Sequence, residues 1–128
     1  MSEKTVLIIE DEEDAADLFA EMMRVSGFRV LKTITSAPAL AMMTAEKPDV
    51  ILLDIMMPEI SGLDILRQMR RDPALAHIPV VIVSAKSMPT DIKNGMEAGA
   101  STYLTKPVGF LDLKEAVERA LASQSPAA

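Results

Sequence analysis

Residues 50–54 have the sequence VILLD, four large aliphatic side chains followed at once by a carboxylate. Two other stretches also have four aliphatic residues before a polar one, VLIIE at 6–10 and VVIVS at 80–84. An uninterrupted aliphatic run of this length is typical of a strand covered on both faces, as in a parallel sheet. Two less apolar runs, RVLKT at 29–33 and TYLT at 102–105, complete a set of five predicted strands.

The segments between these runs have apolar residues three and four positions apart, the spacing of a helix with one buried face. We expect Gly27 to end the first helix and Ser36 to cap the second, with Pro38 in its first turn. The predicted helices cover about residues 15–23, 36–45, 62–71, 90–98 and 110–121. This alternation predicts an α/β fold with a single doubly wound, five-stranded parallel sheet and five helices.

The composition excludes several kinds of site. A chain of 128 residues is enough for one domain with its own core. It has no cysteine and one histidine, His77, which we expect in a solvated loop, so cysteine-ligated and multi-histidine metal sites are ruled out. A net charge of −6 disfavours binding to nucleic acids. The apolar runs are too short to cross a membrane and the first residues do not resemble a signal peptide, so we expect a cytoplasmic globular domain.

Polar side chains follow the predicted strands at their carboxyl ends, the edge where open parallel sheets bind ligands. They are Glu10, Asp11, Asp54, Ser84 and Lys106. Each alone has an ordinary explanation, such as a helix cap, a turn or a solvated side chain. Together, three crowded carboxylates would repel one another, and a hard cation such as Mg²⁺ would relieve that repulsion. A lysine and a hydroxyl beside it would bind a phosphoryl group, with a carboxylate as the nucleophile.

Four motifs carry a family resemblance: VLIIED at 6–11, DVILLDIMMPEISG at 49–62, VVIVSA at 80–85 and GASTYLTKP at 99–107. In this order and at this spacing they resemble the receiver domain of two-component response regulators, of the chemotaxis-regulator type, over residues 4–122. The resemblance implies the flavodoxin-like strand order 2-1-3-4-5. Residues 123–128 would then form a flexible tail or the beginning of a linker.

The resemblance also implies a role for each carboxylate. Asp54 matches the aspartate that receives the phosphoryl group. Mg²⁺, or Mn²⁺ in its place, is expected to be held by Asp11, Asp54 and the backbone carbonyl of Met56. Glu10 is expected to act on the metal through water. The acidic pair is Glu-Asp rather than Asp-Asp, a variant that should leave metal binding intact.

Further residues match the positions that contact the phosphoryl group. Ser84, Lys106 and the backbone of Ala85 are expected to bind its oxygens. Ser84 and Tyr103 match the switch pair, in which the hydroxyl moves toward the phosphoryl group and the aromatic ring turns inward. Pro107 follows the lysine at a position where the family has a cis peptide bond, an uncommon geometry even before proline.

Further residues are expected at the edge of this site. The side chains of Met56 and Lys86 are expected to tune the phosphate lifetime by guiding or blocking water. A set of apolar residues could dock a helix of the phosphodonor: Ala15, Phe19, Pro107 and Val108. For Phe19 a position in the core is favoured. Gly95, inside the helix at 90–98, is compatible with a marginal, easily shifted helix or with an exposed helix that tolerates glycine.

The function implied by the resemblance is that of a phosphoacceptor in a two-component phosphorelay. The domain would take a phosphoryl group from a histidine kinase or histidine phosphotransfer protein onto Asp54. The face of helix four, strand five and helix five would then change to control an unknown partner or output domain. It would catalyse only its own phosphorylation and dephosphorylation. The sequence is compatible with a free-standing regulator and with the receiver part of a longer one.

Three alternatives are weaker. A phosphatase of the haloacid dehalogenase type also forms an aspartyl phosphate, but it needs Asp-x-Asp, and Asp54 is followed by Ile55 and Met56. A flavodoxin needs hydroxyls and free amides in its first phosphate-binding loop, where this chain has acidic residues. A docking domain that acts without phosphorylation would not need the complete set of site residues.

Overall fold

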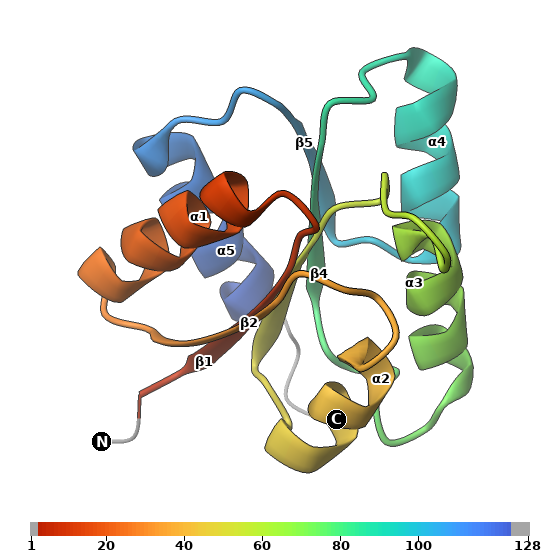
Figure 1. Ribbon diagram of the computed structural model, residues 1–128, viewed down its shortest axis with the longest axis horizontal. Coiled ribbons are helices and arrows are strands. Elements are labelled where there is room, and N and C mark those ends of the chain that lie inside the picture. Colours follow the sequence, from red (N-terminus) through yellow and green to blue (C-terminus); the bar gives the residue numbers. More distant parts are fainter. Residues whose placement is uncertain (1–2, 124–128) are drawn as a thin grey trace.

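The computed structural model describes residues 3–123, which form one sheet of five parallel strands covered by five helices (Figure 1). The strands are β1 (Thr5–Ile9), β2 (Arg29–Thr33), β3 (Val50–Leu53), β4 (Val80–Ser84) and β5 (Thr102–Thr105). The helices are α1 (Glu13–Val25), α2 (Ala39–Glu46), α3 (Gly62–Arg71), α4 (Pro89–Ala98) and α5 (Phe110–Ala122). The order across the sheet is β2-β1-β3-β4-β5 with every neighbouring pair parallel, which confirms the predicted flavodoxin-like topology.

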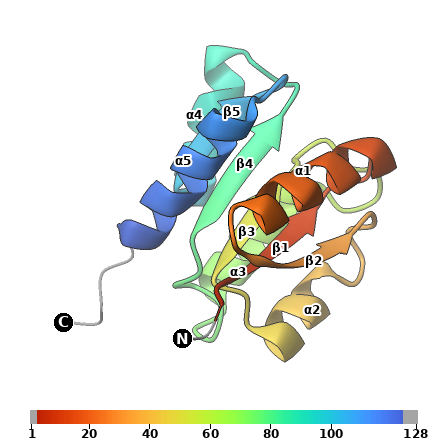
Figure 2. The same cartoon turned by 90° about the vertical axis from the view of Figure 1, so that its left-hand side faces the viewer.

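The helices cover both faces of the sheet, and each face has its own apolar core. Helices α1 and α5 lie on one face, in front of the sheet in Figure 2, and α2, α3 and α4 cover the other. Alternate residues of each central strand enter opposite cores, as Leu7 and Ile8 of β1 do. The central strands β1, β3 and β4 are therefore buried on both faces, which is why their sequences are continuously aliphatic. The edge strands β2 and β5 are partly exposed.

Two of the predicted strands end one residue earlier than expected, and this places carboxylates just past the sheet. Strand β1 ends before Glu10 and β3 ends before Asp54. The backbone amides of both residues still bond to the neighbouring strand, Glu10 N to Thr33 O at 3.1 Å and Asp54 N to Ile9 O at 2.9 Å. The main chain that carries these two side chains is therefore held as firmly as the strands themselves.

The second helix begins later than predicted. The expected cap at Ser36 was wrong, because α2 begins at Ala39 with Pro38 at its N-cap and no side-chain cap. The Ser36 hydroxyl instead donates to Pro58 O and accepts from Ile60 N, both at 3.4 Å, in the loop after β3. A contact distant in sequence thus outweighs the local capping preference.

The other expected helix ends are close to those observed. Gly27 follows α1 with a φ of 95°, and Gly99 ends α4 with a φ of 113°. Gly95 is buried, although most of the residues of α4 around it are exposed or partly exposed. No helix among residues 3–123 is long and apolar enough to cross a bilayer. Apart from Ser123, the predicted tail at 123–128 lies outside the described residues.

Candidate functional site

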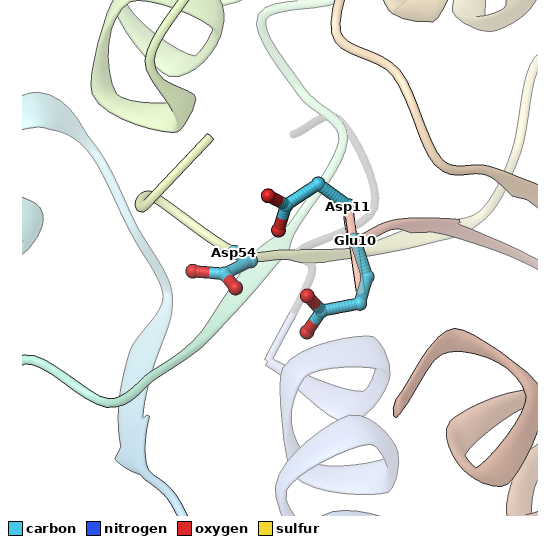
Figure 3. Close-up of side chains that lie close together, drawn as sticks. All are labelled: Glu10, Asp11 and Asp54. Atoms are coloured by element: carbon cyan, nitrogen blue, oxygen red, sulfur yellow. The ribbon is translucent and has the colours of Figure 1, made fainter. Parts of the chain in front are cut away.

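Three carboxylates meet at the carboxyl ends of β1 and β3 (Figure 3). Glu10 and Asp11 follow β1, Asp54 follows β3, and one carboxylate oxygen of each lies within 4.8 Å of the others. Glu10 and Asp54 are only 2% and 5% exposed, whereas Asp11 is exposed. Adjacent parallel strands thus bring together two segments that are more than 40 residues apart, and the cluster opens to solvent on the Asp11 side.

Lys106, just after β5, supplies the positive charge in this cluster. Its Nζ lies 2.6 Å from Glu10 Oε1 and 3.2 Å from Asp54 Oδ2. The same ammonium lies 5.9 Å from the centre of the Phe19 ring on α1, within the range of a cation–π contact. Phe19 is 5% exposed, so the favoured core position is confirmed. One lysine therefore bridges both buried carboxylates and lies near an aromatic face.

Both oxygens of the Asp54 carboxylate accept hydrogen bonds. Oδ1 accepts from the backbone N–H of Met56 at 2.8 Å, and Oδ2 accepts from Lys106. Glu10 is held similarly, since its second oxygen accepts from the N–H of Glu12 at 3.2 Å. These bonds orient both side chains, and no buried side-chain nitrogen or oxygen among residues 3–123 lacks a partner.

Burial and the neighbouring charges shift the pKa values of Glu10 and Lys106. Burial raises the pKa of Glu10 to about 7; the hydrogen bond from Lys106 opposes this shift and the neighbouring Asp54 adds to it. Burial would lower the pKa of Lys106, but the hydrogen bond that Lys106 donates to Glu10 and the charges of Asp54 and Glu10 outweigh this effect, so the net shift is upward. Lys106 therefore remains an ammonium at neutral pH.

The donor set fits a hard divalent cation. Mg²⁺ prefers oxygen ligands and is commonly bound by one or two carboxylates together with water and phosphate oxygens. Glu10, Asp11 and Asp54 offer three such oxygens in one place, one of them on an exposed side chain. A divalent cation here would balance negative charge that a single lysine does not neutralise.

The last residue of β4, the loop that follows it and β5 supply a second group of residues beside the carboxylates. Ser84 is fully buried, and its Oγ accepts from the N–H of Lys86 at 3.2 Å. The hydroxyl of Tyr103 donates to the carbonyl of the same Lys86 at 2.7 Å. Burial is the main cause that raises the pKa of the Tyr103 phenol. The backbone of Lys86 thus connects the two residues that the sequence singled out as a switch pair.

The remaining predicted residues surround this site or lie away from it. Ala85 and the side chain of Lys86 are exposed next to Ser84, and the Met56 side chain is 47% exposed next to Asp54. The Lys106–Pro107 peptide bond is cis, the geometry that the resemblance implies. His77 lies in the exposed loop between α3 and β4, outside the cluster.

One residue of the site was missed from sequence. Gly62, the first residue of α3, lies against the backbone that carries Asp54. A Cβ atom at Gly62 would be 2.4 Å from the carbonyl oxygen of Asp54 and 2.6 Å from Cα of Ile55. Only glycine fits this approach. The available signal was a glycine directly after the helix cap Ser61, which alone does not reveal a tertiary contact.

Comparison with known proteins now identifies the family. Residues 6–118 match the response regulator receiver domain family. The chain belongs to this family. It is 36% identical over 105 residues to the polar-differentiation response regulator DivK of Brucella anthropi, an alignment that covers 82% of this chain and 85% of that protein.

Solved receiver structures agree with this assignment. A CheY-like receiver domain protein from Methanospirillum hungatei superposes with a TM-score of 0.89 at 25% identity, over 96% of this chain and 97% of that one. A response regulator receiver domain protein from Clostridium thermocellum gives 0.85 at 30% identity, over 93% and 94%. The protein therefore contains a receiver domain of two-component signal transduction, with the CheY-like fold.

Proposed function

We propose that Asp54 accepts a phosphoryl group from a phosphohistidine of a partner histidine kinase or histidine phosphotransfer protein in the cytoplasm. An Asp54 carboxylate oxygen forms a bond to phosphorus, and the bond from phosphorus to the imidazole nitrogen breaks, leaving its electron pair on that nitrogen. The domain then acts through positioning and charge.

The observation that carries the proposal is the setting of Asp54. Its carboxylate is 5% exposed, one oxygen accepts from the Met56 amide, and the other accepts from Lys106. It also lies at the carboxyl edge of the sheet beside two further acids. A surface turn would need none of these features, whereas a phosphoryl acceptor needs an oriented nucleophile with a nearby cation.

Each neighbouring residue has a proposed part in the reaction. Lys106 Nζ, Ser84 Oγ and the backbone N–H of Ala85 hold the oxygens of the transferred group. Asp11, Asp54 and the Met56 carbonyl would hold a Mg²⁺ or Mn²⁺ ion, with Glu10 acting through water, and the ion would supply positive charge to the transferred group.

The proposed output is a change in protein contacts. Movement of Ser84 toward the phosphoryl group and of Tyr103 into the space behind it would bias two states of the α4, β5 and α5 face. That face would control a partner protein or an output domain. We propose residues 4–122 as the limits of the domain and 123–128 as its tail or the start of a linker.

The direct test uses acetyl phosphate, a small donor that needs no partner protein. With Mg²⁺ present, intact mass spectrometry should show a gain of one phosphoryl group. The gain should be absent in Asp54→Asn and after EDTA. A gain that persists in Asp54→Asn would place the acceptor elsewhere and contradict the proposal.

A further inference from the structure

Gly95 lies on the buried side of α4, against the ring of the only tyrosine in the chain. A Cβ atom at this position would lie 2.8 Å from Cδ2 and 3.1 Å from Cε2 of Tyr103, and 2.9 Å from Cδ1 of Ile82. Carbon atoms in good contact are roughly 3.5–4.0 Å apart. The Tyr103 ring therefore occupies space that exists only because residue 95 has no side chain.

The other end of the Tyr103 side chain holds the loop between β4 and α4. The phenol hydroxyl donates to the Lys86 carbonyl at 2.7 Å. The N–H of Lys86 in turn donates to Ser84 Oγ at 3.2 Å. A continuous path of contacts thus runs from Gly95 on α4, through the tyrosine and one residue of backbone, to a hydroxyl beside the carboxylate cluster.

We propose that Gly95 is a positioning residue that seats the Tyr103 ring against α4 and thereby fixes the backbone of Lys86 next to Ser84. A methyl group at position 95 would push the ring away from α4 and break its hydrogen bond to Lys86. The packing part of this inference is independent of phosphorylation. Its importance for signalling rests on the proposed function, in which Ser84 and Tyr103 form the switch.

Helix propensity alone predicts a different result for the same substitution. Alanine is a better helix former than glycine, so Gly95→Ala would simply stabilise α4 if residue 95 had room for a side chain. Asn94→Ala provides the matched control, because Asn94 is the exposed neighbour on the same helix and its replacement also raises helix propensity. The two substitutions differ in whether the new methyl group meets Tyr103.

The first measurement is acrylamide quenching of tyrosine fluorescence. The chain has no tryptophan and one tyrosine, so the signal reports on Tyr103 alone. We expect a larger quenching constant in Gly95→Ala than in wild type, because the displaced ring becomes more accessible, and an unchanged constant in Asn94→Ala. Equal constants for all three proteins would overturn the proposed seat.

The second measurement follows the Lys86 amide by NMR. Its resonance should shift in Gly95→Ala and stay in place in Asn94→Ala, because only the first substitution disturbs the bond from Tyr103. An unchanged Lys86 resonance in a variant with a displaced ring would overturn the path to Ser84. Neither measurement uses a phosphoryl donor, so both remain decisive if the mass test at Asp54 fails.

A double-mutant cycle covers the case in which Gly95→Ala folds poorly. In the wild-type background, overpacking should lower the Tm on the order of 5 °C. In a Tyr103→Ala background the ring is gone and only the contact to Cδ1 of Ile82, the end of a flexible side chain, is left, so the same substitution should cost much less Tm. An equal loss of Tm in both backgrounds would show that the tyrosine is not what Gly95 accommodates.

Discussion

Replacing Gly62 with alanine should destabilise the fold and disturb the proposed phosphoryl acceptor at the same time. The added Cβ would lie 2.4 Å from the Asp54 carbonyl oxygen and 2.6 Å from Cα of Ile55. Both atoms belong to the main chain, so no change of side-chain rotamer relieves the clash. The Asp54 amide is also held by Ile9 O at 2.9 Å, so the segment cannot yield without straining its bond to β1.

The size of the effect follows from this geometry. Overpacking a well-packed site costs typically about 1–3 kcal/mol, and we expect the upper end here because backbone has to move. With a urea m-value of about 2 kcal/mol per molar, the unfolding midpoint should fall by about 1–1.5 M. The displaced Asp54 should also gain its phosphoryl group from acetyl phosphate more slowly than in wild type.

The assay is equilibrium urea unfolding followed by circular dichroism. Gly109→Ala is the matched control, because a Cβ at Gly109 would meet nothing within 4 Å and the residue has an ordinary φ of −78°. Gly109 is the N-cap of α5, where alanine is less favourable than glycine, so we expect the control to lose less than about 1 kcal/mol. If Gly62→Ala also remains within that margin, α3 does not pack against Asp54 as tightly as described, and the reasoning is refuted.

Three further predictions concern the charged residues. Wild type should lose stability as the pH rises from about 4.5 to 7, because the Glu10 carboxyl ionises near its ordinary pKa of 4.5 in the unfolded chain but keeps its proton up to about pH 7 in the folded one. Glu10→Gln should remove this loss. Urea midpoints that fall equally between pH 5 and pH 8 in both proteins would contradict the prediction. Lys86→Ala should change the dephosphorylation rate several-fold, measured as decay of the phosphorylated mass, and an equal rate would reject its proposed influence on phosphate lifetime. Arg70→Met should lower stability by about 2 kcal/mol, because its guanidinium makes four hydrogen bonds to the carbonyls of Gly99 and two residues of the α3–β4 loop. Arg67→Met, which removes only an exposed ion pair, is its control in urea unfolding and should have little effect.

The sequence was sufficient for the fold because its signal is local and repeated. The aliphatic runs at 50–53 and 80–84 identify central strands, since a parallel sheet buries both faces of such a strand. Topology then brings Glu10 and Asp54 to the same edge, because the carboxyl ends of neighbouring parallel strands coincide. The gathering of the carboxylates is therefore predictable from strand positions and residue types.

Contacts between distant side chains and backbone could not be predicted in the same way. Ser36 has the identity and position of a helix cap, yet its hydroxyl donates a hydrogen bond to the loop 22 residues further along the chain. Gly62 and Gly95 fit ordinary roles in a helix, and only the packed structure shows what a Cβ would meet at each. The bond between Lys106 and Glu10 likewise depends on distances that no sequence pattern contains.

The most direct test of the central claim is to locate the phosphoryl group within the chain. After incubation with acetyl phosphate and Mg²⁺, borohydride converts an aspartyl phosphate into homoserine, which peptide mass spectrometry assigns to a residue. The account predicts homoserine at position 54 and unmodified aspartate at position 11. Homoserine at Asp11, or a phosphorylated protein with Asp54 intact, would contradict it.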